Sequence, residues 1–260
     1  MATFTNESKY LPPNSGCNVY GVAQLNETYY VICASTNLIL VYNGSFFQQS
    51  PINVTDMVYP TDIAASHLFN CLYVCESIYV WRVNVTNGGY EIDRLFSVSN
   101  AYTLTVTADG RLVSSGYQQL RVFSQNGTLL AAISVSSFVE ILSAAETKTG
   151  NYLMCEADRG RIWEITKTGT VVNSYGGQTG SGPEQLNWAD YVLVDAITGW
   201  AFVADQQNHR VLLLDGQLRE ITQIYTGNNP WRLSWDHQTR ILVSGSFGGQ
   251  PTVFRVNGLN

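Results

Sequence analysis

A short β-type run recurs six times along the chain, and this repeat constrains the fold more than any other feature. The copies are YYVICA (29–34), LYVCES (72–77), RLVSSG (111–116), YLMCEA (152–157), AFVADQ (201–206) and ILVSGS (241–246). Their central residues are Val31, Val74, Val113, Met154, Val203 and Val243, which are spaced by 43, 39, 41, 49 and 40 residues. A period of roughly 40 to 50 residues is typical of the blades of a β-propeller.

Two further β-type runs flank each copy. About eight residues after each copy's centre come LILVYN, YVWRVN, LRVFSQ, RIWEIT, RVLLLD and TVFRVN, and about ten before it come YGVAQ, DIAAS, TLTVT, LSAAE, YVLVD and RLSWD. Turn signals such as ADG (108–110), KTG (148–150) and ITG (197–199) suit hairpins between antiparallel strands. Helical periodicity is missing throughout. The sequence therefore predicts an all-β, six-bladed β-propeller of four-stranded antiparallel blades, forming a single domain over residues 1–260.

The last repeat lacks room for an outermost strand, because only Gly258, Leu259 and Asn260 follow its third run. Residues 2–10, ATFTNESKY, precede the first repeat and alternate as a strand does. We expect them to complete the last blade and close the ring.

Composition limits the classes of function. Hydrophobic residues make up 45% of the chain and charged residues 13%, enough for a large core and incompatible with intrinsic disorder. No run of eighteen apolar residues occurs, so membrane insertion is not expected. The net charge of −6 and the scarcity of lysine argue against a nucleic-acid partner, because phosphate contacts require a basic face.

The five cysteines, Cys17, Cys33, Cys71, Cys75 and Cys155, show no metal-ligand spacing, and no cofactor or metal is expected. Cys75 and Cys155 fall in second strands and should be buried. Cys71 and Cys75 lie too far apart along one strand to bond to each other; only a cross-strand partner such as Cys33 suits either. Six N-x-S/T sequons, at Asn6, Asn26, Asn43, Asn53, Asn84 and Asn126, favour an extracellular over a cytoplasmic location.

One segment carries a family resemblance. Residues 175–215, YGGQTGSGPEQLNWADYVLVDAITGWAFVADQQNHRVLLLD, contain a Gly-rich start, a D-x-x-G turn and an ADxxNxRV core. This segment closely resembles the NHL repeat, and CEADRGRIWEIT (155–166) is the next best copy. The resemblance implies a binding scaffold, used in that family for proteins and, in members with basic faces, for RNA. It also implies that the pairs Asp205–Arg210 and Glu156–Arg161 are structural, the alternative being that Arg161 or Arg210 captures a charged ligand.

Catalytic chemistry finds little support in the sequence. His67, His209 and His237 fall in three different turns and are not expected to converge, and His209 should be a solvated turn residue. The innermost strands are not expected to bring carboxylates together near the channel centre, and no GxSxG, HExxH or P-loop motif occurs. No catalytic or metal-binding residue is assigned. The alternative function is a divergent six-bladed hydrolase or lyase with a metal in the central channel.

Aromatic residues are a better guide to function. Aligning the innermost strands places Val19, Thr61, Tyr102, Ile141, Asp190 and Trp231 just before them and Tyr20, Asp62, Thr103, Leu142, Tyr191 and Arg232 next. Both sets should ring one mouth of the channel, on the face formed by the inter-blade loops. The turns between second and third strands share that face, so the surface gains Trp188, Tyr117, Arg159, Gln207 and Phe247. The alternative role for several of these rings is packing between blades.

We therefore expect a noncatalytic propeller that binds a protein or a glycan through Tyr20, Asp62, Tyr102, Asp190, Trp231 and Arg232. Trp231 and Arg232 are the anchors, with Arg232 paired to Asp62 or Asp190 when the site is empty. Four other tryptophans, Trp81, Trp163, Trp200 and Trp235, are expected in the core. A third hypothesis is an architectural domain cut from a larger protein.

Overall fold

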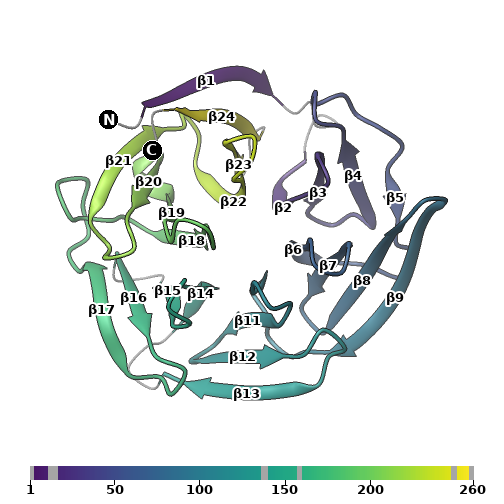
Figure 1. Cartoon of the computed structure of the whole chain (residues 1–260), viewed down its shortest axis with the longest axis horizontal. Coiled ribbons are helices and arrows are strands. Elements are labelled where there is room, and N and C mark those ends of the chain that lie inside the picture. The colour runs from purple at the N-terminus through teal and green to yellow at the C-terminus, as the bar shows by residue number, and fades with distance from the viewer. Residues whose placement is uncertain (1–2, 11–16, 136–139, 157–159, 247–250, 258–260) are drawn as a thin grey trace.

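The computed structural model of the chain describes residues 3–10, 17–135, 140–156, 160–246 and 251–257. Within these residues, six four-stranded antiparallel sheets stand around a central axis, as Figure 1 shows. The prediction of an all-β, six-bladed propeller is confirmed. Ala2, Arg159 and Phe247, to which the sequence assigned roles, lie outside the described residues.

Each blade runs from an innermost strand at the channel to an outermost strand at the rim. The innermost strands of blades 1 to 6 are β2 (Val19–Leu25), β6 (Pro60–Ser66), β10 (Thr103–Val106), β14 (Ile141–Glu146), β18 (Ala189–Val194) and β22 (Pro230–Asp236). The second strands are β3 (Thr28–Cys33), β7 (Cys71–Glu76), β11 (Leu112–Gly116), β15 (Tyr152–Glu156), β19 (Ala201–Asp205) and β23 (Ile241–Ser246). The third strands are β4 (Leu38–Tyr42), β8 (Tyr79–Thr86), β12 (Gln119–Phe123), β16 (Arg161–Ile165), β20 (Arg210–Leu214) and β24 (Thr252–Asn257).

The outermost strands are β5 (Ile52–Asn53), β9 (Gly89–Ser97), β13 (Leu129–Ser134), β17 (Val171–Gly176) and β21 (Glu220–Tyr225), with β1 (Thr3–Tyr10) in blade 6. β1 pairs antiparallel with β24, from Thr3 opposite Asn257 to Tyr10 opposite Thr252. The sixth sheet therefore has the order β1-β24-β23-β22 and joins the two ends of the chain. Strand pairing of this kind covers an edge that would otherwise be open.

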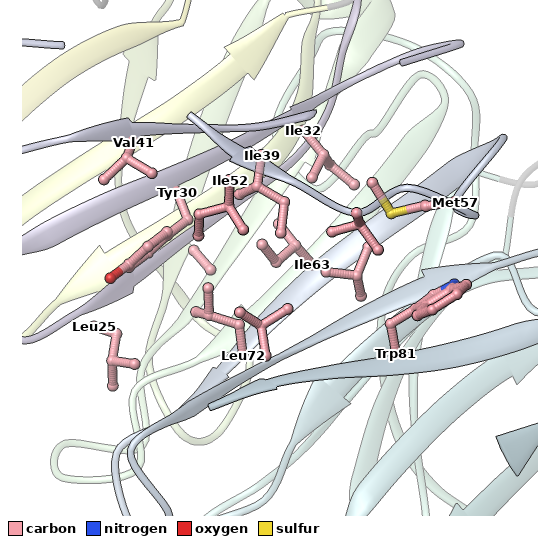
Figure 2. Close-up of a cluster of buried hydrophobic side chains, with 14 residues drawn as sticks. Leu25, Tyr30, Ile32, Ile39, Val41, Ile52, Met57, Ile63, Leu72 and Trp81 are labelled. Carbon is pink, nitrogen blue, oxygen red and sulfur yellow. The ribbon is translucent and has the colours of Figure 1, made fainter. Parts of the chain in front are cut away.

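The core is divided among the seams between blades. Six clusters of buried hydrophobic side chains are found among the described residues, and each draws on two neighbouring blades. Figure 2 shows the seam between blades 1 and 2, where Ile32 and Ile39 lie with Ile63 and Leu72. Successive residues of a strand point to opposite faces, so Tyr30 of β3 packs in this seam and Val31 in the seam with blade 6. The second strands are buried on both faces, which explains their nearly continuous apolar runs.

Four tryptophans pack in these seams as the sequence predicted. Trp81 is buried between blades 1 and 2. Trp163 packs half-buried against the seam of blades 3 and 4, and Trp200 and Trp235 pack against that of blades 5 and 6. Their rings serve the core.

The tight turns also follow the sequence signals. Gly110, Gly150 and Gly199 end the ADG, KTG and ITG turns with φ values of 84°, 82° and 81°, a left-handed conformation that glycine adopts most easily. Helix within the described residues is confined to the short 3₁₀ turn η2 (Gln206–Asn208). No helix in the described part of the chain is long and apolar enough to cross a bilayer.

The cysteines divide into one disulfide and three thiols. Cys17 and Cys33 form a disulfide between the start of blade 1 and the end of β3. Cys33 is therefore not available to Cys71 or Cys75, the partners considered from sequence. Cys75 and Cys155 are free and fully buried, which confirms the prediction for both.

Candidate functional site

The predicted site residues lie where the innermost strands begin, and β-bulges occur at these positions. In five of the six innermost strands the register with the second strand skips one residue: Tyr20, Thr61, Leu142, Asp190 or Trp231. A bulge leaves its extra residue outside the ladder and redirects its side chain. Three predicted site residues, Tyr20, Asp190 and Trp231, are bulge residues.

The bulges also correct the sequence alignment. Equivalent positions in blades 1 and 4 are Tyr20 and Leu142, one residue after the Val19 and Ile141 that the sequence had aligned with Asp190 and Trp231. Periodicity alone cannot reveal a single inserted residue. β10 has no bulge, and Tyr102 instead donates its backbone N–H to Ser115 O just before the strand starts.

The centre of the site is a buried group of charges contributed by three blades. Arg232 of blade 6 lies with its Nε 3.7 Å from Asp62 Oδ1 of blade 2, and the two side chains are 7% and 1% exposed. Asp62 also accepts backbone N–H groups from Ile63 and, across the seam, from Leu104 of blade 3. The expected pairing of Arg232 with Asp62 is present, and it joins blades that are far apart in sequence.

Asp190 is the second carboxyl group of this cluster. It is only 2% exposed, and its Oδ2 accepts no hydrogen bond from the described residues. Burial raises the pKa of Asp190 to about 7, although the nearby Arg232 opposes the shift. Burial likewise raises the pKa of Asp62 to about 7, against Arg232 and the N–H groups that Asp62 accepts. Asp62 and Asp190, which the sequence placed at the channel mouth, thus both lie beside Arg232.

Aromatic rings enclose the arginine. The Arg232 guanidinium lies over Trp231 at 5.0 Å and over Tyr191 at 5.3 Å from the ring centroids. Tyr20 of blade 1 packs against Trp231, with ring centroids 6.2 Å apart. Cation–π contacts of this kind are favourable where water is excluded. Five of the six predicted residues are thus joined in one group, and Tyr191 belongs to it as well.

Tyr102 belongs to a different group. Its pKa is raised by partial burial and by Glu140 and Tyr117 nearby, and no contact among the described residues joins it to Arg232. Tyr102 therefore marks the side of the channel mouth formed by blades 3 and 4.

Buried carboxylates hold the loops of the same face in place. Glu76, at the end of β7, accepts the backbone N–H of Val58 at 2.7 Å and the Trp81 indole N–H at 2.6 Å. Asp205, at the end of β19, accepts the backbone N–H of Asn187 at 2.7 Å. The loops that lead into blades 2 and 5 are therefore anchored to second strands by buried side chains.

Asp205 also forms an ion pair with Arg210, whose Nε lies 2.7 Å from Asp205 Oδ2, and both side chains are almost fully buried. Arg210 also donates to Gln185 O at 2.7 Å and to Gln223 Oε1 at 2.7 Å. This ion pair ties the inter-blade loop to two strands. In blade 4, which carries the second copy of this motif, Glu156 lies opposite Arg161 and accepts the Trp163 indole N–H at 3.0 Å. The Arg161 guanidinium stacks over the Trp163 ring.

Large apolar side chains project from these anchored loops and from the turns between second and third strands on the same face. Among the described residues, those exposed on the loops and turns of the inter-blade face include Val58 (56%), Tyr59 (62%), Ile78 (57%), Tyr117 (57%) and Trp188 (41%). We call these five residues the apolar rim. Trp188 has a φ of 62°, and its carbonyl accepts the N–H of Gln206. A bulky residue in this conformation is uncommon and is held only by surrounding structure.

Sequence reasoning named Trp188 and Tyr117 but missed Val58, Tyr59, Ile78 and the anchoring residue Glu76. The signal for Glu76 was present, because CESIYVW (75–81) repeats the acid-to-tryptophan order of CEADRGRIW (155–163). Aliphatic loop residues carry no comparable pattern.

The histidines depart in part from expectation. His209 lies in the turn after η2, but His67 and His237 line one cavity on the opposite face. No group of three or more His, Cys, Asp or Glu side chains within the described residues is arranged to hold a metal ion.

Comparison of the chain with protein-family models found no matching model, and comparison with curated proteins found no match. The six-bladed fold and the geometry of its two faces are therefore the basis for any functional inference. A six-bladed propeller is consistent with a binding scaffold.

Proposed function

We propose that this chain is a noncatalytic binding scaffold of the NHL-propeller type, and that its inter-blade face binds a partner protein. The observation that carries the proposal is the apolar rim, three of whose residues, Val58, Tyr59 and Trp188, lie on loops anchored by buried carboxylates. Glu76 accepts the backbone N–H of Val58, and Asp205 accepts the backbone N–H of Asn187, the residue before Trp188. Loops fixed before binding lose little conformational entropy when a partner docks.

The composition of the rim favours a protein over a glycan. Sugars are bound by flat aromatic rings with polar groups at their edges, whereas Val58 and Ile78 are branched aliphatic side chains exposed to water. Exposed apolar groups surrounded by polar surface are typical of protein interfaces. An acidic, lysine-poor chain is also poorly suited to nucleic acid.

The buried charge cluster supports this face from below. This cluster consists of Asp62, Asp190 and Arg232, which are too buried to contact a large partner directly. It links blades 2, 5 and 6 and lies behind the half-buried rings of Tyr20 and Trp231. Trp231 then contributes contact area, and Arg232 positions it through the cation–π contact.

The NHL-type assignment rests on the ADxxNxRV segment. In the structure its acid, amide and arginine meet: Asp205 accepts Asn208 Nδ2 at 2.8 Å and Arg210 Nε at 2.7 Å. The motif therefore holds the ends of strands β19 and β20 of blade 5 together, the structural role that the resemblance implies.

The test is a screen of the immobilised chain against extracellular protein domains and a glycan array, followed by matched tyrosine substitutions. Tyr59→Ser and Tyr117→Ser alter the rim, and Tyr90→Ser alters an exposed tyrosine on the outermost strand β9. We expect each rim variant to weaken protein binding by more than about 1 kcal/mol and the control to bind normally. Equal binding by all three variants, or binding to glycans alone, would contradict the proposal.

A further inference from the structure

A cavity of about 660 Å³ lies on the face opposite the apolar rim. Its lining comes from the ends of the innermost strands of blades 1, 5 and 6 and from the turns after the innermost strands of blades 1, 2, 5 and 6, and it includes Gln24, Glu27, His67, Asp195 and His237. The volume is within the range of small-molecule sites, roughly 300 to 1,000 Å³. We call it the rear cavity.

Gln24 is the first sign that the rear cavity takes a polar ligand. Its side chain belongs to innermost strand β2 and is 9% exposed. No hydrogen bond within the described part of the chain involves its side-chain amide, although the residue lines the cavity. Buried amides are normally hydrogen-bonded, so this amide is available to a ligand.

His237 is the second sign, because a buried carboxylate fixes its orientation. Its Nδ1 lies 2.8 Å from Asp195 Oδ2, and Asp195 also accepts the Thr198 hydroxyl at 2.7 Å and the Ile197 N–H at 3.1 Å. Burial alone would raise the pKa of Asp195, but these hydrogen bonds and His237 outweigh it and lower that pKa. A neutral imidazole that donates through Nδ1 presents Nε2 as a hydrogen-bond acceptor.

The negative charge of the residues that line the rear cavity favours a positively charged ligand. Glu27, Asp195 and Asp236 contribute carboxylates, and the described residues that line the rear cavity include no lysine or arginine. A concave surface lined by one sign of charge attracts the opposite sign. The neighbouring cavity of about 390 Å³ differs, because Lys148 lines it and Arg111 bridges Asp109 and Glu146 there.

We propose that the rear cavity is a second binding site, and that it takes a primary ammonium group with Gln24, Glu27 and His237 as hydrogen-bond acceptors. An ammonium group carries three N–H donors and a positive charge, so it satisfies acceptors that face a negative cavity. The group can belong to a free polyamine or to a lysine side chain of a peptide. This site does not depend on the function of the inter-blade face.

Isothermal titration calorimetry tests the assignment with three probes: spermidine as the free amine, Nα-acetyl-lysine methylamide as the lysine side chain, and glycerol as a neutral control. We expect at least one amine to bind and glycerol not to bind. Binding of spermidine alone assigns the site to free amines, whereas binding of the lysine derivative assigns it to peptides.

Variants locate the site. Glu27→Gln and Gln24→Leu should each weaken amine binding about tenfold, as expected for loss of a hydrogen bond to a charged group. Glu91→Gln removes an exposed carboxylate from β9 and serves as the matched control. The assignment is overturned if neither amine binds more tightly than glycerol, or if Glu91→Gln weakens binding as much as Glu27→Gln does. Circular dichroism spectra and the melting temperatures of all three variants establish that they are folded.

Discussion

Replacing Asp190 by Asn should stabilise the protein relative to wild type, and the gain should grow as the pH rises. The carboxyl group is 2% exposed, and burial raises its pKa from 3.8 to about 7. The folded chain therefore holds this proton at pH values where the unfolded chain has released it. Between those two pKa values the wild type loses stability as pH increases, because ionisation is easier in the unfolded state. Asparagine has nearly the same shape and no charge to bury.

The size of the effect follows from the two pKa values. Each pKa unit corresponds to about 1.4 kcal/mol, so the full shift amounts to roughly 4 kcal/mol. Part of the loss has already occurred by pH 5 and nearly all of it by pH 8. We expect the stability of Asp190→Asn minus that of wild type to rise by roughly 2 to 3 kcal/mol across this interval.

Urea denaturation at pH 5, 6, 7 and 8 measures this difference, with Asp56→Asn as a control for loss of an exposed carboxylate. A difference that stays constant with pH would refute the reasoning. A variant that becomes less stable than wild type as pH rises would show that Arg232 keeps Asp190 ionised in the fold.

Three further perturbations address other parts of the molecule. Native Cys75 and Cys155 should resist alkylation, because both are fully buried and burial raises each thiol pKa to about 12; rapid labelling, followed by mass spectrometry, would contradict the strand register. Deleting residues 1–10 should lower the melting temperature markedly by exposing the edge of β24, and an unchanged melting curve would count against the role of β1. Trp231→Ala should weaken partner binding by more than about 1 kcal/mol with a smaller effect on stability; a loss of several kcal/mol of stability at unchanged affinity would assign the ring to packing instead.

The repeat made the fold predictable because each blade satisfies the same packing requirement. Val31, Val74 and Val203 recur at blade spacing since every second strand is buried between two seams. The grouping of most candidate residues was also predictable, because antiparallel blades bring the starts of all innermost strands to one mouth. Tyr20 and Trp231 meet there although they are at opposite ends of the sequence.

What the sequence did not reveal depends on contacts between blades. One-residue bulges shifted the alignment in blades 1 and 4, and they change side-chain direction without changing composition. The shared cavity of His67 and His237 likewise depends on ring geometry.

Hydrogen exchange of the chain, free and saturated with the partner protein found by the screen, tests the central claim most directly. We predict slower exchange at residues 54–59, 117–118 and 187–188, which belong to the inter-blade face, and unchanged exchange in the outermost strands β13 and β17. Protection confined to the outermost strands or to the turns of the opposite face would contradict the proposal that the apolar rim binds the partner.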